Sequence, residues 1–285
     1  MKKITFIIAA TLAAPAMIFA QNSGTVKLAN GQKYSVENKI ATSSSSEMQG
    51  QSMETTADVT TVYNIEVNGM KDDNYNMTNK IAAVKLTMNT MGQNINFDSD
   101  KKEDMDGQMG ASFKEIINQP KPVTMDKGGN IVLAKGADTS SSKESANQTD
   151  MILKQLGDPQ TIGYGAKMAF LAIPSDAKTG TAWTDSSSAE GVTRVTNYVI
   201  KGIDNGIATI TVSGTEARDT KMEMQGMEIN TKTTGTFSGE QTADIKTGII
   251  NQNSLTADSK GTISVMGQDI PTTIKATSTT TVKAL

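Results

Sequence analysis

The residues of this chain that could carry out acid–base or metal chemistry are carboxylates, because the sequence contains no histidine and no cysteine. The densest carboxylate cluster lies in the segment DSDKKEDMDG, residues 98–107. Loops rich in carboxylate oxygens can bind calcium. However, Gly107 and the acidic residues do not follow the order D-x-[DN]-x-[DN]-G of an EF-hand loop. This spacing favours a solvated loop, and we predict no metal site.

Two pairs of carboxylates are candidates for general acid–base catalysis, Asp244 with Glu240 and Asp185 with Glu190. A gap of four or five residues in an extended chain does not bring two side chains together, and no pattern marks these residues as buried. The absence of histidine excludes Ser-His-Asp and Cys-His catalysis and the commonest zinc ligand. The sequence therefore predicts a protein that is not an enzyme and has no cofactor. Catalysis through Asp185 or Asp244 remains an alternative.

Methionine is the other unusual component, with 17 methionines against six phenylalanines and one tryptophan. Methionine adapts its shape to its neighbours, so a methionine-lined face suits an apolar ligand. The expected lining residues share one face of the predicted strands: Met53, Tyr63, Ile65, Val84, Leu86, Met88, Met222, Met224, Met227 and Ile229. The alternative is that these side chains fill a core beneath short helices.

Residues 194–282 must position part of this face, and their pattern has a period of two. Between Met227 and Gly239 the odd positions are less polar, and the even positions are polar or charged. Glycine-containing segments separate the alternating segments from one another, at 204–206, 225–226, 247–248 and 266–269. Alternation broken by such turns predicts an antiparallel sheet with one covered face.

The first half of the chain shows the same alternation. Residues 33–48 and 53–67 are predicted to be strands. In the strand that follows them, the apolar residues change from odd to even positions at 81–82, which predicts a β-bulge there. A strand from 53 to 67 would extend about 50 Å, and ribbons of that length coil and curl. The predicted fold is mainly β with minor α, with long coiled antiparallel strands in one or two half-barrel-like sheets covered by short helices.

The middle of the chain differs. Residues 112–119, 151–157 and 165–173 have helical spacing, and 122–134 reads as a hairpin with glycines in its turn. We therefore divide the chain into a signal peptide (1–20), a first β region (21–135), a linker with short helices (136–178) and a second β meander (179–285). Methionine-flanked glycine turns recur in both β regions, which suggests an internal duplication. Recurrence through composition alone is the alternative.

The first twenty residues place two lysines before an apolar run and a small residue at Ala20. This pattern predicts a secretory signal peptide and a location in the periplasm or at the cell surface, with no membrane span after cleavage.

The chain has a net charge of −3 and two arginines, so nucleic-acid binding is not expected. A transmembrane β-barrel is disfavoured because the drier face is rich in threonine, serine and glycine and only 4% of residues are aromatic.

Residues 179–215 and 235–250 resemble an uncharacterised secreted family of Gram-negative bacteria, a domain of unknown function, and the resemblance spans nearly the whole mature chain. The resemblance rests on an entry motif G-x-x-W-T-D, a tyrosine-led strand, an aromatic-glycine strand end and a turn D-x-x-T-G. The residues that carry it are Gly180, Trp183, Asp185, Tyr198, Phe237, Gly239, Asp244, Thr247 and Gly248. The resemblance implies no catalytic residue. At the level of the fold, long coiled strands with short covering helices are similar to the half-barrels of lipoprotein carriers.

These observations lead to a secreted, non-enzymatic envelope protein that binds an apolar or lipid-like ligand in a concave sheet. The alternative is an envelope scaffold or adhesion protein that presents its polar strand faces to a protein partner.

Overall fold

The structure, a computed structural model, describes residues 20–21, 24–48, 51–90, 93–132, 163–189, 191–224, 227–265 and 267–285. One predicted helix, at 151–157, lies outside these ranges, as do residues 1–19 of the expected signal peptide.

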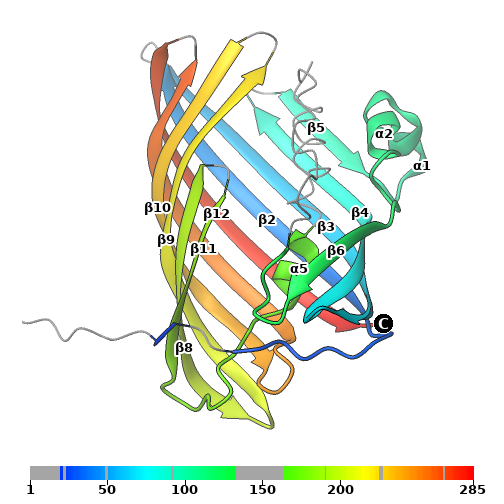
Figure 1. The fold of residues 1–285 in the computed structure, drawn as a ribbon. Helices are drawn as coiled ribbons and strands as arrows, with labels where there is room; N and C mark the ends of the chain where they lie inside the picture. The colour runs from blue at the N-terminus through cyan, green and yellow to red at the C-terminus, as the bar shows by residue number, and fades with distance from the viewer. Residues whose placement is uncertain are drawn as a thin grey trace, which may run out of the picture.

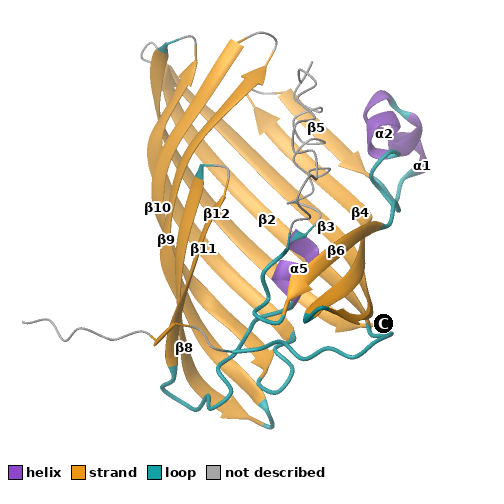
Figure 2. Ribbon diagram, viewed as in Figure 1, coloured by secondary structure: helices purple, strands orange, loops and turns teal. Residues whose placement is uncertain are grey.

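A single twelve-stranded sheet dominates the fold (Figures 1 and 2). Its order is β1 (Ala20–Gln21), β7 (Ala182–Ala189), β8 (Val192–Asp204), β9 (Ile207–Met224), β10 (Met227–Asp244), β11 (Ile250–Val265), β12 (Gln268–Ala284), β2 (Lys33–Met48), β3 (Gln51–Lys71), β4 (Asn74–Thr90) and β5 (Gln93–Asp98). A further strand, β6 (Lys121–Asp126), pairs with β4 beside β5. All pairings are antiparallel except that of β1 with β7.

The predicted fold class is therefore confirmed, and both β regions belong to one sheet. Antiparallel pairing of β12 with β2 joins them. The predicted bulge is also confirmed: the register between β3 and β4 shifts after Val62, where Ala83 and then Ile81 are the partners. This shift lets Ile81 and Val84 both point to the buried face although their parities differ.

The sheet curls around an open interior, and its described edges do not pair with each other, so it is not closed into a barrel (Figure 1). Most side chains on the concave face are buried or half-buried, whereas those on the convex face of β2 and β3 are mostly polar. The alternation read from the sequence is the result of this difference between the two faces.

Two glycines on the concave face allow the curl at β9–β11. An added Cβ at Gly239 would overlap the carbonyl oxygen of Ser254 on β11, and one at Gly214 would overlap Val195 and the ring of Phe237. Neighbouring backbones can approach this closely only where no Cβ intervenes.

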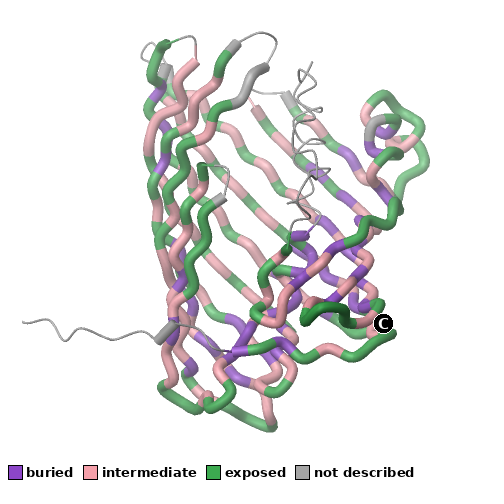
Figure 3. The backbone as a smooth tube through the Cα atoms, viewed as in Figure 1, coloured by how far each residue is buried: buried purple, intermediate pink, exposed green. Residues whose placement is uncertain are grey.

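Short elements fill one end of the concave side. Helix α5 (Tyr164–Ala169) contacts β2, β3 and β11 (Figure 1). The segment before β2 crosses the same end, where the Tyr75 hydroxyl donates a hydrogen bond to the Val26 carbonyl (2.9 Å). Most of the buried residues gather at this end, while the rest of the concave face is half-buried (Figure 3).

The helices α1 (Lys102–Asp106) and α2 (Gln108–Phe113) lie at the β5 edge (Figure 2). The rings of Phe97 on β5 and Phe113 on α2 stack with centroids 4.2 Å apart. This contact attaches the helical pair to the edge of the sheet.

Two helix predictions need correction. The helix expected at 112–119 is wrong for most of its length: the helix α2 precedes it and ends at Phe113, and Ile117 forms a bridge with Ile81 of the sheet. The helix expected at 165–173 is α5, which stops at Ala169 because Phe170 bridges to Ile249. In both cases contacts with the sheet override the local helical spacing. The hairpin expected at 122–134 is confirmed by the bridge between Met125 and Ile131.

We expect Gly239→Ala to lower the free energy of unfolding by about 1–3 kcal/mol, because the new methyl group must displace a neighbouring strand. Thermal unfolding followed by circular dichroism measures the change. Gly202→Ala is the matched control, since an added Cβ there meets no atom within 4 Å. Equal melting temperatures for the two variants would show that the close approach at Gly239 is not required.

Candidate functional site

The candidate site is the part of the concave face that lies beyond α5. Cross-strand register places its side chains in rows across the sheet. One row consists of Leu255, Ser278, Ile40, Val59 and Leu86, and the next consists of Phe237, Ala257, Ala276, Thr42, Ala57 and Met88. Most of these side chains are half-buried. They form an apolar surface with interleaved hydroxyl groups that we call the trough.

The predicted lining residues separate into two groups. Tyr63, Ile65, Val84 and Leu86 are buried, and Leu86 is the buried member at the β4 end of its trough row. An added Cβ at Gly165 of α5 would stand 2.9 Å from the Tyr63 ring, so this helix covers Tyr63. Burial raises the pKa of Tyr63 to about 12. For Tyr63, the alternative of a core beneath a short helix describes the structure better.

Met53, Met88 and Ile229 lie half-buried on the concave face, in the trough or on its continuation. Met222, Met224 and Met227 belong to β9 and β10 by their backbones, and their side chains lie outside the described part of the chain. The structure thus brings the predicted residues to one face and divides them between a filled end and a half-open end.

A row of uncharged polar side chains runs between these two ends and was missed by the sequence analysis. It consists of Gln241, Asn253, Thr280, Asn38 and Thr61, on the adjacent strands β10, β11, β12, β2 and β3. We call it the polar row. Four of its members are buried, and Asn253 is half-buried. Their positions in sequence span more than 240 residues, so only the register of the folded sheet reveals the row.

Both arginines of the chain lie on the concave face of β8 and β9. The Arg194 guanidinium stands 3.9 Å from the centroid of the Phe237 ring. Glu216 forms ion pairs with Arg194 (3.6 Å) and Arg218 (3.3 Å). Because one carboxylate serves two guanidinium groups, the cluster keeps a net positive charge, and its side chains are about 30–40% exposed.

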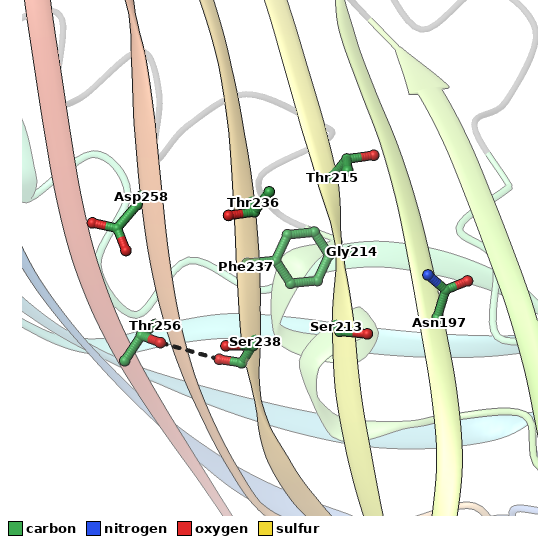
Figure 4. Close-up of a pocket in the computed structure, with 9 residues that line it drawn as sticks. All are labelled: Asn197, Ser213, Gly214, Thr215, Thr236, Phe237, Ser238, Thr256 and Asp258. Carbon is green, nitrogen blue, oxygen red and sulfur yellow. Dashed lines mark hydrogen bonds between the residues drawn. The ribbon is translucent and has the colours of Figure 1, made fainter. Parts of the chain in front are cut away.

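The convex face carries a shallow depression of about 360 Å³ across β8–β11 (Figure 4). Hydroxyl groups dominate its lining, with Asn197 and Asp258 at its two sides. The Thr256 hydroxyl donates to the Ser238 carbonyl (3.3 Å), as the dashed line in Figure 4 shows. Asp258 is its one carboxylate, and its lining residues include no lysine or arginine. The depression offers hydrogen bonds and no recognisable reaction centre.

The proposed catalytic carboxylates do not come together. Glu240 pairs with Lys201 (2.7 Å) on the convex face. Asp244 instead stabilises the turn before β11, because its Oδ1 accepts hydrogen bonds from the Lys246 N–H (2.9 Å), the Thr247 N–H (2.8 Å) and the Thr247 hydroxyl (2.9 Å). Asp185 is exposed, and Glu190 lies outside the described residues.

The hydrogen bonds to Asp244 also set its ionisation. Partial burial raises the pKa of this carboxyl, but the bonds from Thr247 and Lys246 outweigh burial and leave it below the ordinary value. The Asp244 carboxylate therefore has a structural explanation that does not require catalysis.

Within the described ranges, no group of three or more acidic side chains is arranged to hold a metal ion. In the acidic segment 98–107, Asp98 and Asp100 both pair with Lys85, at 3.3 and 3.0 Å. The helices that the structure describes include none long and apolar enough to cross a membrane.

Comparison with protein families gives a match over residues 72–250, more than half of the chain, to the model described as "Family of unknown function (DUF6263)". The chain belongs to this family. The prediction of a family without an assigned function is therefore confirmed. No curated protein matches the sequence.

Several solved structures share a resemblance in fold. Lipovitellin, from a structure concerned with lipid–protein interactions, has 12% identity and a TM-score of 0.45, covering 90% of this chain and 25% of its own. This chain therefore spans about a quarter of the lipovitellin chain. The translocator domain of the autotransporter NalP from Neisseria meningitidis has 9% identity and a TM-score of 0.37, with 89% of each chain covered.

An outer membrane channel from Pseudomonas putida F1 has 8% identity and a TM-score of 0.27, covering 93% of this chain and all of its own. At these identities and TM-scores the likenesses carry no functional argument.

We expect Asp244→Ala to lower the free energy of unfolding by about 1 kcal/mol at pH 7, because three hydrogen bonds are lost. A carboxyl with a depressed pKa stabilises the fold above its ordinary pKa of about 4, and this contribution is lost as the pH falls through the folded-state pKa. The difference from the parent chain should therefore shrink below pH 3. Chemical unfolding of the variant and the parent chain at pH 7 and below pH 3 measures this difference. Asp58→Ala, at an exposed position, is the control. A difference that is the same at both pH values would contradict this role.

Proposed function

We propose that this protein is a non-enzymatic carrier of the cell envelope that holds an apolar or lipid-like ligand in the trough. The observation that supports this proposal most directly is the half-buried state of the apolar side chains on a concave face. Ile40, Val59 and Leu255 all belong to this group. On the adjacent convex face, Lys39, Asp58 and Ser254 are exposed.

An apolar surface of this kind gains free energy when it is removed from water. Each methylene group of a ligand buried against it contributes up to about 0.8 kcal/mol. A chain with ten buried methylenes would therefore gain up to about 8 kcal/mol, from which the cost of immobilising the ligand must be subtracted. The gain grows with each further methylene group, so longer apolar chains should bind more tightly.

The shape of the trough favours a small, elongated ligand over a flat partner surface. A concave sheet bends away from a planar membrane or a flat protein face, whereas a chain can lie along its strands. The residues at the centre are small, among them Ala57, Ala257 and Ala276, which leaves room above the sheet floor.

The location in the envelope is part of the proposal. It is supported by the leader pattern expected over residues 1–20, with its paired lysines and apolar run. A carrier in this location would bind its ligand without a cofactor, and the described carboxylates give no reason to assign a reaction.

The proposal is tested by filling the trough. Ala276→Trp places a large ring on the concave face of β12, while Thr277→Trp places the same ring on the exposed convex face of the same strand. We expect the purified parent chain to bind the fluorescent probe N-phenyl-1-naphthylamine. Ala276→Trp should weaken this binding at least about tenfold, the equivalent of about 1.4 kcal/mol, and Thr277→Trp should not.

Melting temperatures of both variants confirm that they fold. No probe binding by the parent chain, together with no lipid recovered by solvent extraction of the purified protein, would rule out the carrier. Equal loss of binding in the two tryptophan variants would place the probe elsewhere.

A further inference from the structure

We infer that the polar row is the recognition site for an uncharged, hydrogen-bonding head group, and that the ligand's apolar chain extends from it along the trough. This inference rests on the proposed function, and it adds the chemical class and the orientation of the ligand.

The key residue is Gln241, which is only 4% exposed. Its Nε2 has no hydrogen-bond partner, and neither has the buried Oδ1 of Asn253. Gln241 and Asn253 are directly opposite each other on β10 and β11. A buried amide group without a partner is unfavourable and calls for an explanation, of which a ligand atom is one.

The rest of the row is better satisfied. The Thr280 hydroxyl donates to Asn38 Oδ1 (3.1 Å) and also lies 3.9 Å from the Met168 sulfur of the covering helix α5. Unused hydrogen-bonding capacity is therefore concentrated at Gln241 and Asn253, where one atom can donate and the other can accept. A ligand group with both a carbonyl oxygen and a hydroxyl or N–H would satisfy both atoms.

The surroundings favour an uncharged head group. No member of the polar row carries a charge, and the Arg194–Glu216 ion pair lies farther along the trough, since Glu216 is opposite Gly235, six residues from Gln241 on β10. A charged head group would be buried at the row without a counter-charge, at a large desolvation cost. An ester, amide or alcohol group carries no charge and so avoids this desolvation cost.

The position of the row also orients the ligand. On one side lies the filled core, including Val36, Tyr63 and Val282, and on the other lie Leu255 and Ile40 of the trough. A head group at Gln241 and Asn253 therefore requires the chain to extend away from α5, over the half-buried apolar side chains.

The test compares two competitors with the same chain length, monodecanoylglycerol, which carries a carbonyl and two hydroxyl groups, and decane, which carries none. Each displaces N-phenyl-1-naphthylamine from the parent chain and from Gln241→Met, which keeps the side-chain length and removes the amide. Gln252→Met, at an exposed position on β11, is the matched control.

We expect the parent chain and Gln252→Met to bind monodecanoylglycerol about tenfold more tightly than decane. In Gln241→Met this preference should disappear, with the affinity for decane unchanged. Its melting temperature without ligand should not fall, because an unpaired buried amide is removed.

The inference is overturned if the parent chain shows no preference between the competitors, or if Gln241→Met retains the preference. Either result with decane still bound leaves the carrier intact and removes the head-group site, in which case Gln241 and Asn253 bond to each other or to water. Failure of the probe to bind any variant, the parent included, together with no lipid recovered by solvent extraction, instead rejects the carrier itself.

Discussion

The pairing of β12 with β2 is the interaction on which the rest of the structure depends. It joins the last strand of the chain to the first long strand over thirteen residue pairs, from Thr272 with Ser46 to Ala284 with Tyr34. Without it the strands of the two β regions would form separate sheets, each with an additional open edge. Because of it, rows of side chains run without interruption across both regions, and one concave face replaces two smaller ones.

This pairing also determines what could be learned from the sequence. Period two correctly predicted the long strands and the drier face of β3 and β10, since alternation depends on local burial alone. The bulge near Ile81 was likewise visible as a switch of parity. The polar row was not, because Asn38 and Thr280 are 242 residues apart and become neighbours only through the β12–β2 register.

For the candidate lining residues, too, the sequence predicted the face of the sheet but not the contacts made by the folded chain. Their face followed from parity, but which part of that face is covered depends on α5 and on the segment before β2. Tyr63 lies against α5, whereas Met88, two residues beyond Leu86 on β4, is only half-buried. Hydrophobicity alone could not predict that Tyr63 is covered and Met88 is not, because both side chains are apolar and both point to the concave face. The helix prediction at 112–119 failed over most of its length, and the one at 165–173 failed at its C-terminal end, for a related reason. Ile117 bridges to Ile81 of the sheet, and Phe170 bridges to Ile249 just before β11.

Side-chain size, rather than polarity, distinguishes the filled end of the concave face from the trough. At the filled end, the large residues Tyr34, Phe170 and Met77 all belong to the buried core, and the rings of Tyr34 and Phe170 pack edge to face with centroids 5.5 Å apart. In the trough, short side chains stand between the larger apolar ones: Ala257, Ala276, Thr42 and Ala57 lie in one row, and Ser278 lies in the next. The same glycines that permit the curl, Gly214 and Gly239, also lower the floor of the trough. A sheet that had to bury this face by itself would need large side chains here, so the small ones favour a face that is completed by a ligand.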